Sequence, residues 1–139
     1  MKYLIDFPSQ KASALFEYNS EGLLIKYELT PGVFESEHYC FLASKFPFNT
    51  KNIESWQQSK MRNVIIRQIA EDLSFERFYE LYDQKFGKKQ RAKAIWDSLS
   101  DIEKAKAIAF IPKYNQHLAQ TGFAKKNAET YLNQQIWNN

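Results

Sequence analysis

Residues 14–29 read ALFEYNSEGLLIKYEL and decide the fold of the first half of the chain. Two runs rich in β-forming residues, 14–18 and 23–29, flank the turn Asn19-Ser20-Glu21-Gly22, and Gly22 can adopt the positive φ that this turn needs. A similar run, Lys2 to Phe7, precedes them and is ended by Pro8-Ser9. The sequence therefore predicts a three-stranded antiparallel β-meander.

Two short helices and one further strand are predicted after the meander. In residues 35–46 the apolar side chains Tyr39, Leu42, Ala43 and Phe46 recur with helical spacing, and Pro47 ends the helix. Asn49 or Thr50 can cap a second helix that runs through Gln58. Residues 61–69 contain Val64-Ile65-Ile66, which favours a fourth strand over an extension of that helix.

From Ser74 onward the pattern is helical. Ser74 is a natural N-cap for a helix with one aromatic stripe, and Gly87 is expected to cap its C-terminus. The stripe consists of Phe75, Phe78, Tyr79 and Tyr82. The next helix is expected from Lys88 to Leu99, and its inward side chains are Ala92, Ile95, Trp96 and Leu99.

Two more helices complete this half. Ser100 and Glu103 form a capping box for a helix that carries Ile108, Ile111 and Leu118. Pro112 is expected to kink or break that helix, and Gly122 to end it. Asn127 can cap a last helix that carries Tyr131, Leu132 and Trp137.

The predicted fold class is therefore α+β, with an N-terminal antiparallel β-meander and short helices followed by a helical C-terminal half. The boundary is expected near Glu71-Asp72-Leu73, which gives domains 1–73 and 74–139, although both could share one compact domain. At 139 residues, 44% of them hydrophobic, the chain is long enough to bury a core. No apolar run approaches the ~20 residues that span a bilayer, and Met1 to Phe7 lacks the features of a signal peptide.

The sequence carries no recognisable catalytic or metal motif. Cys40 is the one cysteine, so no internal disulfide forms, which suits a reducing compartment inside a cell. Cys40, His38 and His117 do not have the spacing of a metal site, and nothing marks Cys40 as a nucleophile. The four glycines are too scattered for a phosphate-binding loop. We expect a non-enzymatic binding protein without cofactors, and a thiol enzyme that uses Cys40 stays the least favoured alternative.

A cluster of cations is the strongest candidate site. Residues 74–139 hold 11 Lys and Arg against 7 Asp and Glu, whereas residues 1–73 hold 8 against 9. Five of these cations fall within nine residues around Gly87, at the start of a predicted helix: Lys85, Lys88, Lys89, Arg91 and Lys93. Lys125 and Lys126 form a second small cluster before another helix. Such places attract phosphate, although a solvated polar helix face is the alternative.

The aromatic residues fall into two groups. The stripe from Phe75 to Tyr82, together with Trp96, has the spacing of a core rather than of a stacking platform. Phe46, Phe48 and Trp56 lie in less regular surroundings, and we expect them to form an exposed patch that binds a protein partner.

Residues 73–139 resemble a known family. Phe75-Glu76-Arg77-Phe78-Tyr79, Ile111-Pro112-Lys113-Tyr114 and the ending Thr130-Tyr131-Leu132-Asn133-Gln134-Gln135-Ile136-Trp137 are similar to the C-terminal region of phage and prophage replisome-organiser, DnaT-like replication proteins. The resemblance implies a phage or mobile-element origin, a role beside nucleic acid and a location in the cytoplasm of a bacterial host cell. Such proteins usually place a winged helix before this region, whereas residues 1–72 here predict a meander.

Two functions follow as expectations. The favoured one is a phage or prophage inhibitor, of the anti-CRISPR type, that docks on a host RNA-guided nuclease or a similar nucleoprotein complex. The alternative is a replication accessory protein that binds single-stranded DNA, or RNA, or a helicase loader. Neither expectation involves a membrane, and the oligomeric state is left open.

Overall fold

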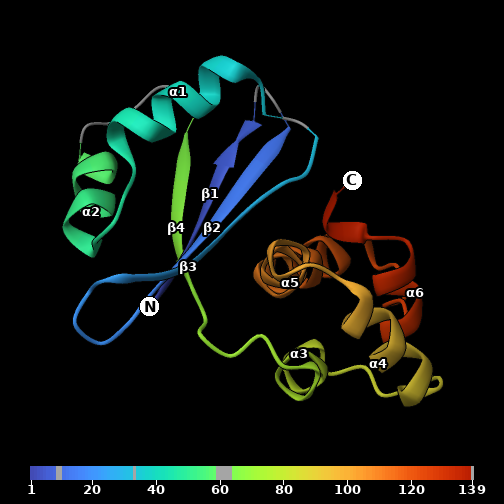
Figure 1. Ribbon diagram of the computed structural model, residues 1–139. Coiled ribbons are helices and arrows are strands. Elements are labelled where there is room, and N and C mark those ends of the chain that lie inside the picture. Colours follow the sequence, from blue (N-terminus) through green and yellow to red (C-terminus); the bar gives the residue numbers. More distant parts are fainter. Residues whose placement is uncertain (9–10, 33, 59–63, 139) are drawn as a thin grey trace. The chain divides into compact units, whose positions relative to one another are not determined.

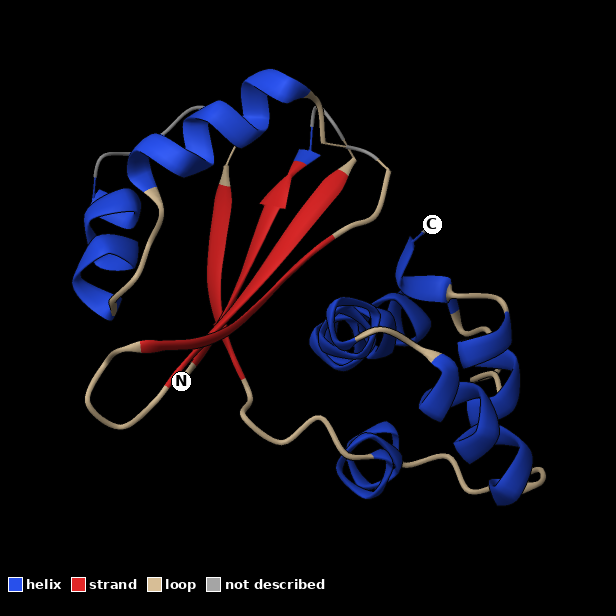
Figure 2. Cartoon of the chain, viewed as in Figure 1, coloured by secondary structure: helices blue, strands red, loops and turns tan. Residues whose placement is uncertain are grey.

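The computed structural model describes residues 1–8, 11–32, 34–58 and 64–138. The chain divides into two compact units, Met1–Glu71 and Asp72–Asn139, within the stretch where the composition changes. Unit 1 carries the strands and two helices, and unit 2 is helical (Figures 1 and 2). The fold class is α+β, as predicted from the sequence. No helix in the described ranges combines the length and apolar character needed to cross a membrane.

Unit 1 is built on a four-stranded antiparallel sheet in the order β3-β2-β1-β4. The strands are β1 (Lys2–Phe7), β2 (Ala12–Tyr18), β3 (Leu24–Leu29) and β4 (Ile65–Ile69). The meander forms as predicted, because β1 pairs with β2 and β2 pairs with β3. The fourth strand is shorter than predicted, since it begins at Ile65; residues 61–63 of the predicted strand lie outside the described ranges.

Helices α1 (Ser36–Lys45) and α2 (Thr50–Gln58) cover one face of this sheet (Figure 1). Adjacent residues of a strand point to opposite faces of the sheet, so residues two apart, such as Tyr3 and Ile5, share a face. Their partners on β2, Phe16 and Ala14, lie on that same face. Leu42 from α1, and Ile53 and Trp56 from α2, are buried against that face. Tyr18 Oη donates to the carbonyl of Pro47 at 2.7 Å and so anchors the connection between the two helices.

Trp56 is therefore a core residue, and the prediction that it lies in an exposed patch is wrong. Its side chain is 7% exposed. Ile53 and Trp56 are three residues apart on α2, which places both on the face that packs on the sheet. Phe46 also packs against this core, whereas Phe48 is 66% exposed, as expected.

Unit 2 contains α3 (Phe75–Tyr82), α4 (Lys89–Ser98), α5 (Asp101–Thr121), α6 (Ala128–Asn133) and the short 3₁₀ helix η2 (Ile136–Asn138). The predicted N-caps are present, because the side chains of Ser74, Ser100 and Asn127 accept from the backbone N–H three residues ahead. The Glu103 carboxylate accepts from Trp137 Nε1 at 2.6 Å, which ties the end of the described chain to the start of α5.

The core of unit 2 is aromatic. Phe78 stacks on Trp96 with ring centroids 4.7 Å apart, and Tyr131 lies 4.7 Å from Tyr82. The buried hydroxyls are satisfied by backbone carbonyls: Tyr131 Oη donates to Ala107 at 2.7 Å and Tyr82 Oη to Lys126 at 2.5 Å. Burial, followed by the neighbouring tyrosines, raises the pKa of Tyr82 and Tyr131 above the ordinary value.

One predicted helix end in unit 2 is wrong, and of the two outcomes predicted at Pro112 the break does not occur, whereas Gly122 caps α5 as expected. Helix α3 ends at Tyr82 and is capped by Asp83 in the left-handed conformation, with φ 52°, rather than by Gly87. Helix α5 continues past Pro112 to Thr121 instead of breaking there. Proline costs one backbone hydrogen bond, but Ile111 and Tyr114 on either side are buried in the core, and this burial holds the helix together.

Replacing Gly22 with alanine is expected to destabilise unit 1 more than the same change at Gly32. Both glycines have positive φ, 80° and 74°. A Cβ on Gly22 would lie 2.7 Å from Thr50 Oγ1, at the start of α2, whereas nothing lies within 4 Å of a Cβ on Gly32. Urea unfolding should therefore show a loss of about 1 kcal/mol for Gly32→Ala, from backbone strain alone, and a larger loss for Gly22→Ala. Equal losses would contradict the close approach of Thr50.

Alkaline pH is expected to unfold unit 2 as its tyrosines ionise. A folded-state pKa raised above 10.0 means that the folded chain holds these protons more tightly than the unfolded chain does. The stabilisation is complete below pH 10 and is lost as pH rises towards the folded pKa values. Tyrosinate absorbance should rise together with the loss of near-ultraviolet circular dichroism from the aromatic core. Full ionisation of all tyrosines with the spectrum intact would contradict the burial of Tyr82 and Tyr131.

Candidate nucleic-acid interface

Two loops of unit 2 lie side by side. The α3–α4 loop passes Asn127, because a Cβ on Gly87 would lie 3.2 Å from the Asn127 Nδ2 atom. Gly87 has φ 96°, a conformation that only glycine adopts readily, so the loop can approach the start of α6 closely. The α5–α6 loop, residues 122–127, ends at that same asparagine.

A reciprocal pair of hydrogen bonds joins the same two segments. Tyr82 Oη donates to the Lys126 carbonyl, and Lys125 Nζ donates to the Tyr82 carbonyl. The Lys125 ammonium also lies 4.5 Å from the centre of the Tyr82 ring. Burial lowers the pKa of Lys125, and the charge of Asp83 opposes that shift.

Exposed cations and aromatic rings gather on these loops. The α3–α4 loop and the start of α4 present Lys85, Phe86, Lys88 and Lys89, and the α5–α6 loop presents Phe123 and Lys126. We call these six residues the basic–aromatic surface. Phe86 is 81% exposed and Phe123 is 70% exposed, the two highest values among the large hydrophobic side chains of the described chain. Exposed apolar rings near exposed cations are candidate contacts for a ligand.

The cations predicted from the sequence divide into three groups. Lys85, Lys88, Lys89 and Lys126 are exposed, and in the part of the chain that the structure describes no carboxylate forms an ion pair with them. Lys89 additionally lies over the Tyr79 ring at 5.1 Å. Arg91 and Lys93 face carboxylates on the surface, Glu129 at 4.0 Å and Asp97 at 3.0 Å. The hydrogen bond to Asp97 raises the pKa of Lys93.

Lys125 forms the third group, because its ammonium is engaged inside the fold, and its role as a binding cation stays a prediction. It lies partly buried between Tyr82 and the loop, where its ammonium serves the fold. Neighbouring lysines thus have different roles, since Lys126 points to solvent while its backbone carbonyl accepts from Tyr82.

The start of α4 adds to the positive character of the surface. Lys88 is the N-cap residue of α4, and its side chain makes no capping hydrogen bond. The first N–H groups of a helix carry partial positive charge and are the usual partners of phosphate oxygens. Charge and backbone donors therefore coincide at Lys88 and Lys89.

Sequence reasoning missed Phe86 and Phe123. Both lie beside a glycine with positive φ, in Phe86-Gly87-Lys88 and Gly122-Phe123, and both fall outside the helical stripes. An aromatic residue next to a glycine and near lysines, outside every helical stripe, was the available signal.

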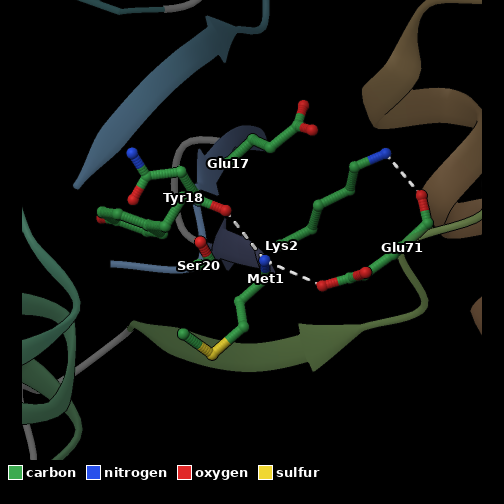
Figure 3. Close-up of a pocket in the computed structure, with 7 residues that line it drawn as sticks. Met1, Lys2, Glu17, Tyr18, Ser20 and Glu71 are labelled. Carbon is green, nitrogen blue, oxygen red and sulfur yellow. Dashed lines mark hydrogen bonds and ion pairs between the residues drawn. The ribbon is translucent and has the colours of Figure 1, made fainter. Parts of the chain in front are cut away.

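Other places in the described structure offer weaker sites. In unit 1 a pocket of about 620 Å³ lies beside Met1, Lys2, Tyr18 and Glu71 (Figure 3). Its polar groups bind one another: the Met1 ammonium contacts the Glu71 carboxylate at 2.9 Å, and Lys2 Nζ donates to the Glu71 carbonyl at 2.6 Å. The hydrogen bond to that ammonium, followed by its charge, lowers the pKa of Glu71.

Metal and thiol chemistry gain no support from the geometry. No group of three or more histidine, cysteine or acidic side chains able to hold a metal occurs within the described residues. Cys40 is exposed on α1, His117 is exposed on α5 in the other unit, and the His38 side chain lies outside what the structure describes. The expectation of a non-enzymatic protein stays a prediction.

Part of the chain is similar to a known protein family. Residues 70–135 match the family model of the Legionella vir region protein LvrA C-terminal domain. The match covers slightly less than half of the chain and lies almost entirely within unit 2. No curated protein and no solved structure matches the chain. Unit 2 is thus similar to a module that recurs at the C-terminus of another protein, and it is the module that carries the basic–aromatic surface.

Lys125 and Lys126 provide a matched pair for separating folding from binding. Lys125→Ala is expected to cost about 1–2 kcal/mol in urea unfolding, because the hydrogen bond to Tyr82 and the contact with its ring are both lost. Lys126→Ala removes the same charge from an exposed side chain and should leave the unfolding free energy within about 0.5 kcal/mol of the parent. A larger loss for Lys126→Ala than for Lys125→Ala would contradict the assigned roles.

Proposed function

We propose that the protein is a non-enzymatic binding protein and that unit 2 contacts single-stranded nucleic acid through the basic–aromatic surface. The observation that carries the proposal is the pair of exposed rings, Phe86 and Phe123, on adjacent loops among four exposed lysines. Lysines attract the phosphate backbone of any nucleic acid. Exposed rings add affinity for unpaired bases, whose faces are free to stack.

The proposal corresponds to the replication accessory role expected from the sequence. It also agrees with the phage-type resemblance of residues 73–139, which implies a role beside nucleic acid. A duplex hides the faces of its bases, so it would use only the lysines and bind more weakly.

The inhibitor of an RNA-guided nuclease is the second candidate, and the exposed side chain of Phe48 favours it. Phe48 belongs to unit 1 and packs on Phe46 with ring centroids 4.7 Å apart. A ring that is supported on one side and exposed on the other is a typical anchor for a protein partner. In this version unit 1 docks on the nuclease while unit 2 contacts its guide or target strand.

The test measures fluorescence anisotropy of labelled single-stranded DNA, RNA and duplex over a range of salt concentrations. Phe86→Ala is expected to weaken single-strand binding by about 1–3 kcal/mol without changing the salt dependence. The double variant Lys88→Glu/Lys89→Glu should weaken binding to single strands and to duplex alike. For single strands, the plot of log K against log salt concentration should become less steep by about 0.7 for each lost phosphate contact.

Matched controls lie in unit 1. Phe48→Ala removes an exposed ring, and Lys51→Glu makes the same charge change as at Lys88, in both cases outside the basic–aromatic surface. Neither should alter binding of bare nucleic acid. If the parent chain ignores bare single strands, the main proposal is wrong. Binding to a guide-loaded nuclease that Phe48→Ala abolishes would then establish the second candidate.

A further inference from the structure

Strand β3 forms an edge of the sheet and exposes apolar side chains. Within the described residues, in the order β3-β2-β1-β4, the strand that pairs with β3 is β2, with a register shift between Glu17 and Tyr18. Ile25 is 59% exposed and Tyr27 is 54% exposed. Exposed apolar edges template pairing with another strand, and proteins usually protect them unless the edge is used.

The open part of the edge begins after Leu24. At the start of β3, Leu24 N–H donates to the Phe48 carbonyl and Leu23 forms an isolated bridge with Asn49, so this end is covered. Thr30 N–H donates to Ser13 on β2. The backbone N–H and C=O groups of successive residues point alternately to the two sides of an antiparallel strand. Those of Glu28 and Lys26 therefore also point towards β2, and those of Tyr27 and Leu29 point away from it.

We propose that β3 pairs antiparallel with β3 of a second copy of this chain, about a two-fold axis at Tyr27. In that register Tyr27 meets Tyr27, and Ile25 meets Leu29 of the second copy. Lys26 meets Glu28, and the symmetry makes this ion pair twice. An isologous interface requires a surface that is complementary to itself, and the order Lys26-Tyr27-Glu28 has that property.

The existing contacts of β3 agree with this register. Tyr27 is already held against Phe46 and Phe16, with ring centroids 5.2 Å and 6.3 Å away, so little side-chain freedom is lost on pairing. Lys26 lies opposite Glu17 on β2 and would then have a carboxylate on both sides. Ile25 and Leu29 lie on either side of Tyr27, so the apolar pairs would flank the axis.

A charge swap tests the register, using the full chain without nucleic acid. Sedimentation equilibrium should show a parent chain that dimerises with concentration, weakly because the strand is short. Glu28→Lys leaves the Lys26–Glu17 pairing intact but sets Lys26 against a lysine twice, so it should weaken the dimer by about tenfold or more. Lys26→Glu places a carboxylate opposite Glu28 of the other copy, twice in the dimer, and should weaken the dimer similarly.

The decisive measurement mixes the two single variants. A Glu28→Lys chain and a Lys26→Glu chain restore both ion pairs in the heterodimer, so the mixture should associate more tightly than either variant alone. Circular dichroism checks that each variant is folded. A parent chain that stays monomeric up to about 1 mM overturns the proposal, as does a heterodimer no tighter than the variants. A monomeric chain would leave this edge to a strand from another protein.

Discussion

In unit 2 the end of α3 and the α5–α6 loop exchange two hydrogen bonds, one from the Tyr82 hydroxyl to the Lys126 carbonyl and one from the Lys125 ammonium to the Tyr82 carbonyl. Each donor is a side chain and each acceptor a backbone carbonyl, so both segments are held at a set distance. The Tyr82 ring is completely buried among aromatic neighbours, and its position is therefore not free to adjust. The placement of the two exposed loops depends on this exchange.

Lysines from two separate segments of the chain therefore lie on neighbouring loops. The α3–α4 loop supplies most of the cations, the α5–α6 loop supplies Lys126, and each loop supplies one exposed ring. A rigid aromatic core supports loops that need not be well packed themselves, which is the usual division between scaffold and binding residues. The match of residues 70–135 to a domain of another protein agrees with a self-contained module of this kind.

Unit 1 differs, because among its described residues most of strand β3 has no partner on its outer side. The two helices cover one face of the sheet, and the connection between them covers only the start of β3. If β3 pairs with its copy as proposed, two helical units would be attached to one continuous sheet. Linking two binding modules raises the apparent affinity for a long ligand without any new contact. The two proposals rest on separate surfaces and can fail independently.

The sequence by itself determined the elements, since strand alternation, the Gly22 turn and the caps at Ser74, Ser100 and Asn127 are local features that need no distant partner. The cationic cluster around Gly87 was also visible. Only the tertiary structure decided that Trp56 is buried, that α5 continues through Pro112, and that Lys125 serves the fold while Lys126 faces water. The physical reason is the same in each case. Burial and long-range hydrogen bonds depend on which segments meet, and those contacts outweigh the local preference of a single residue.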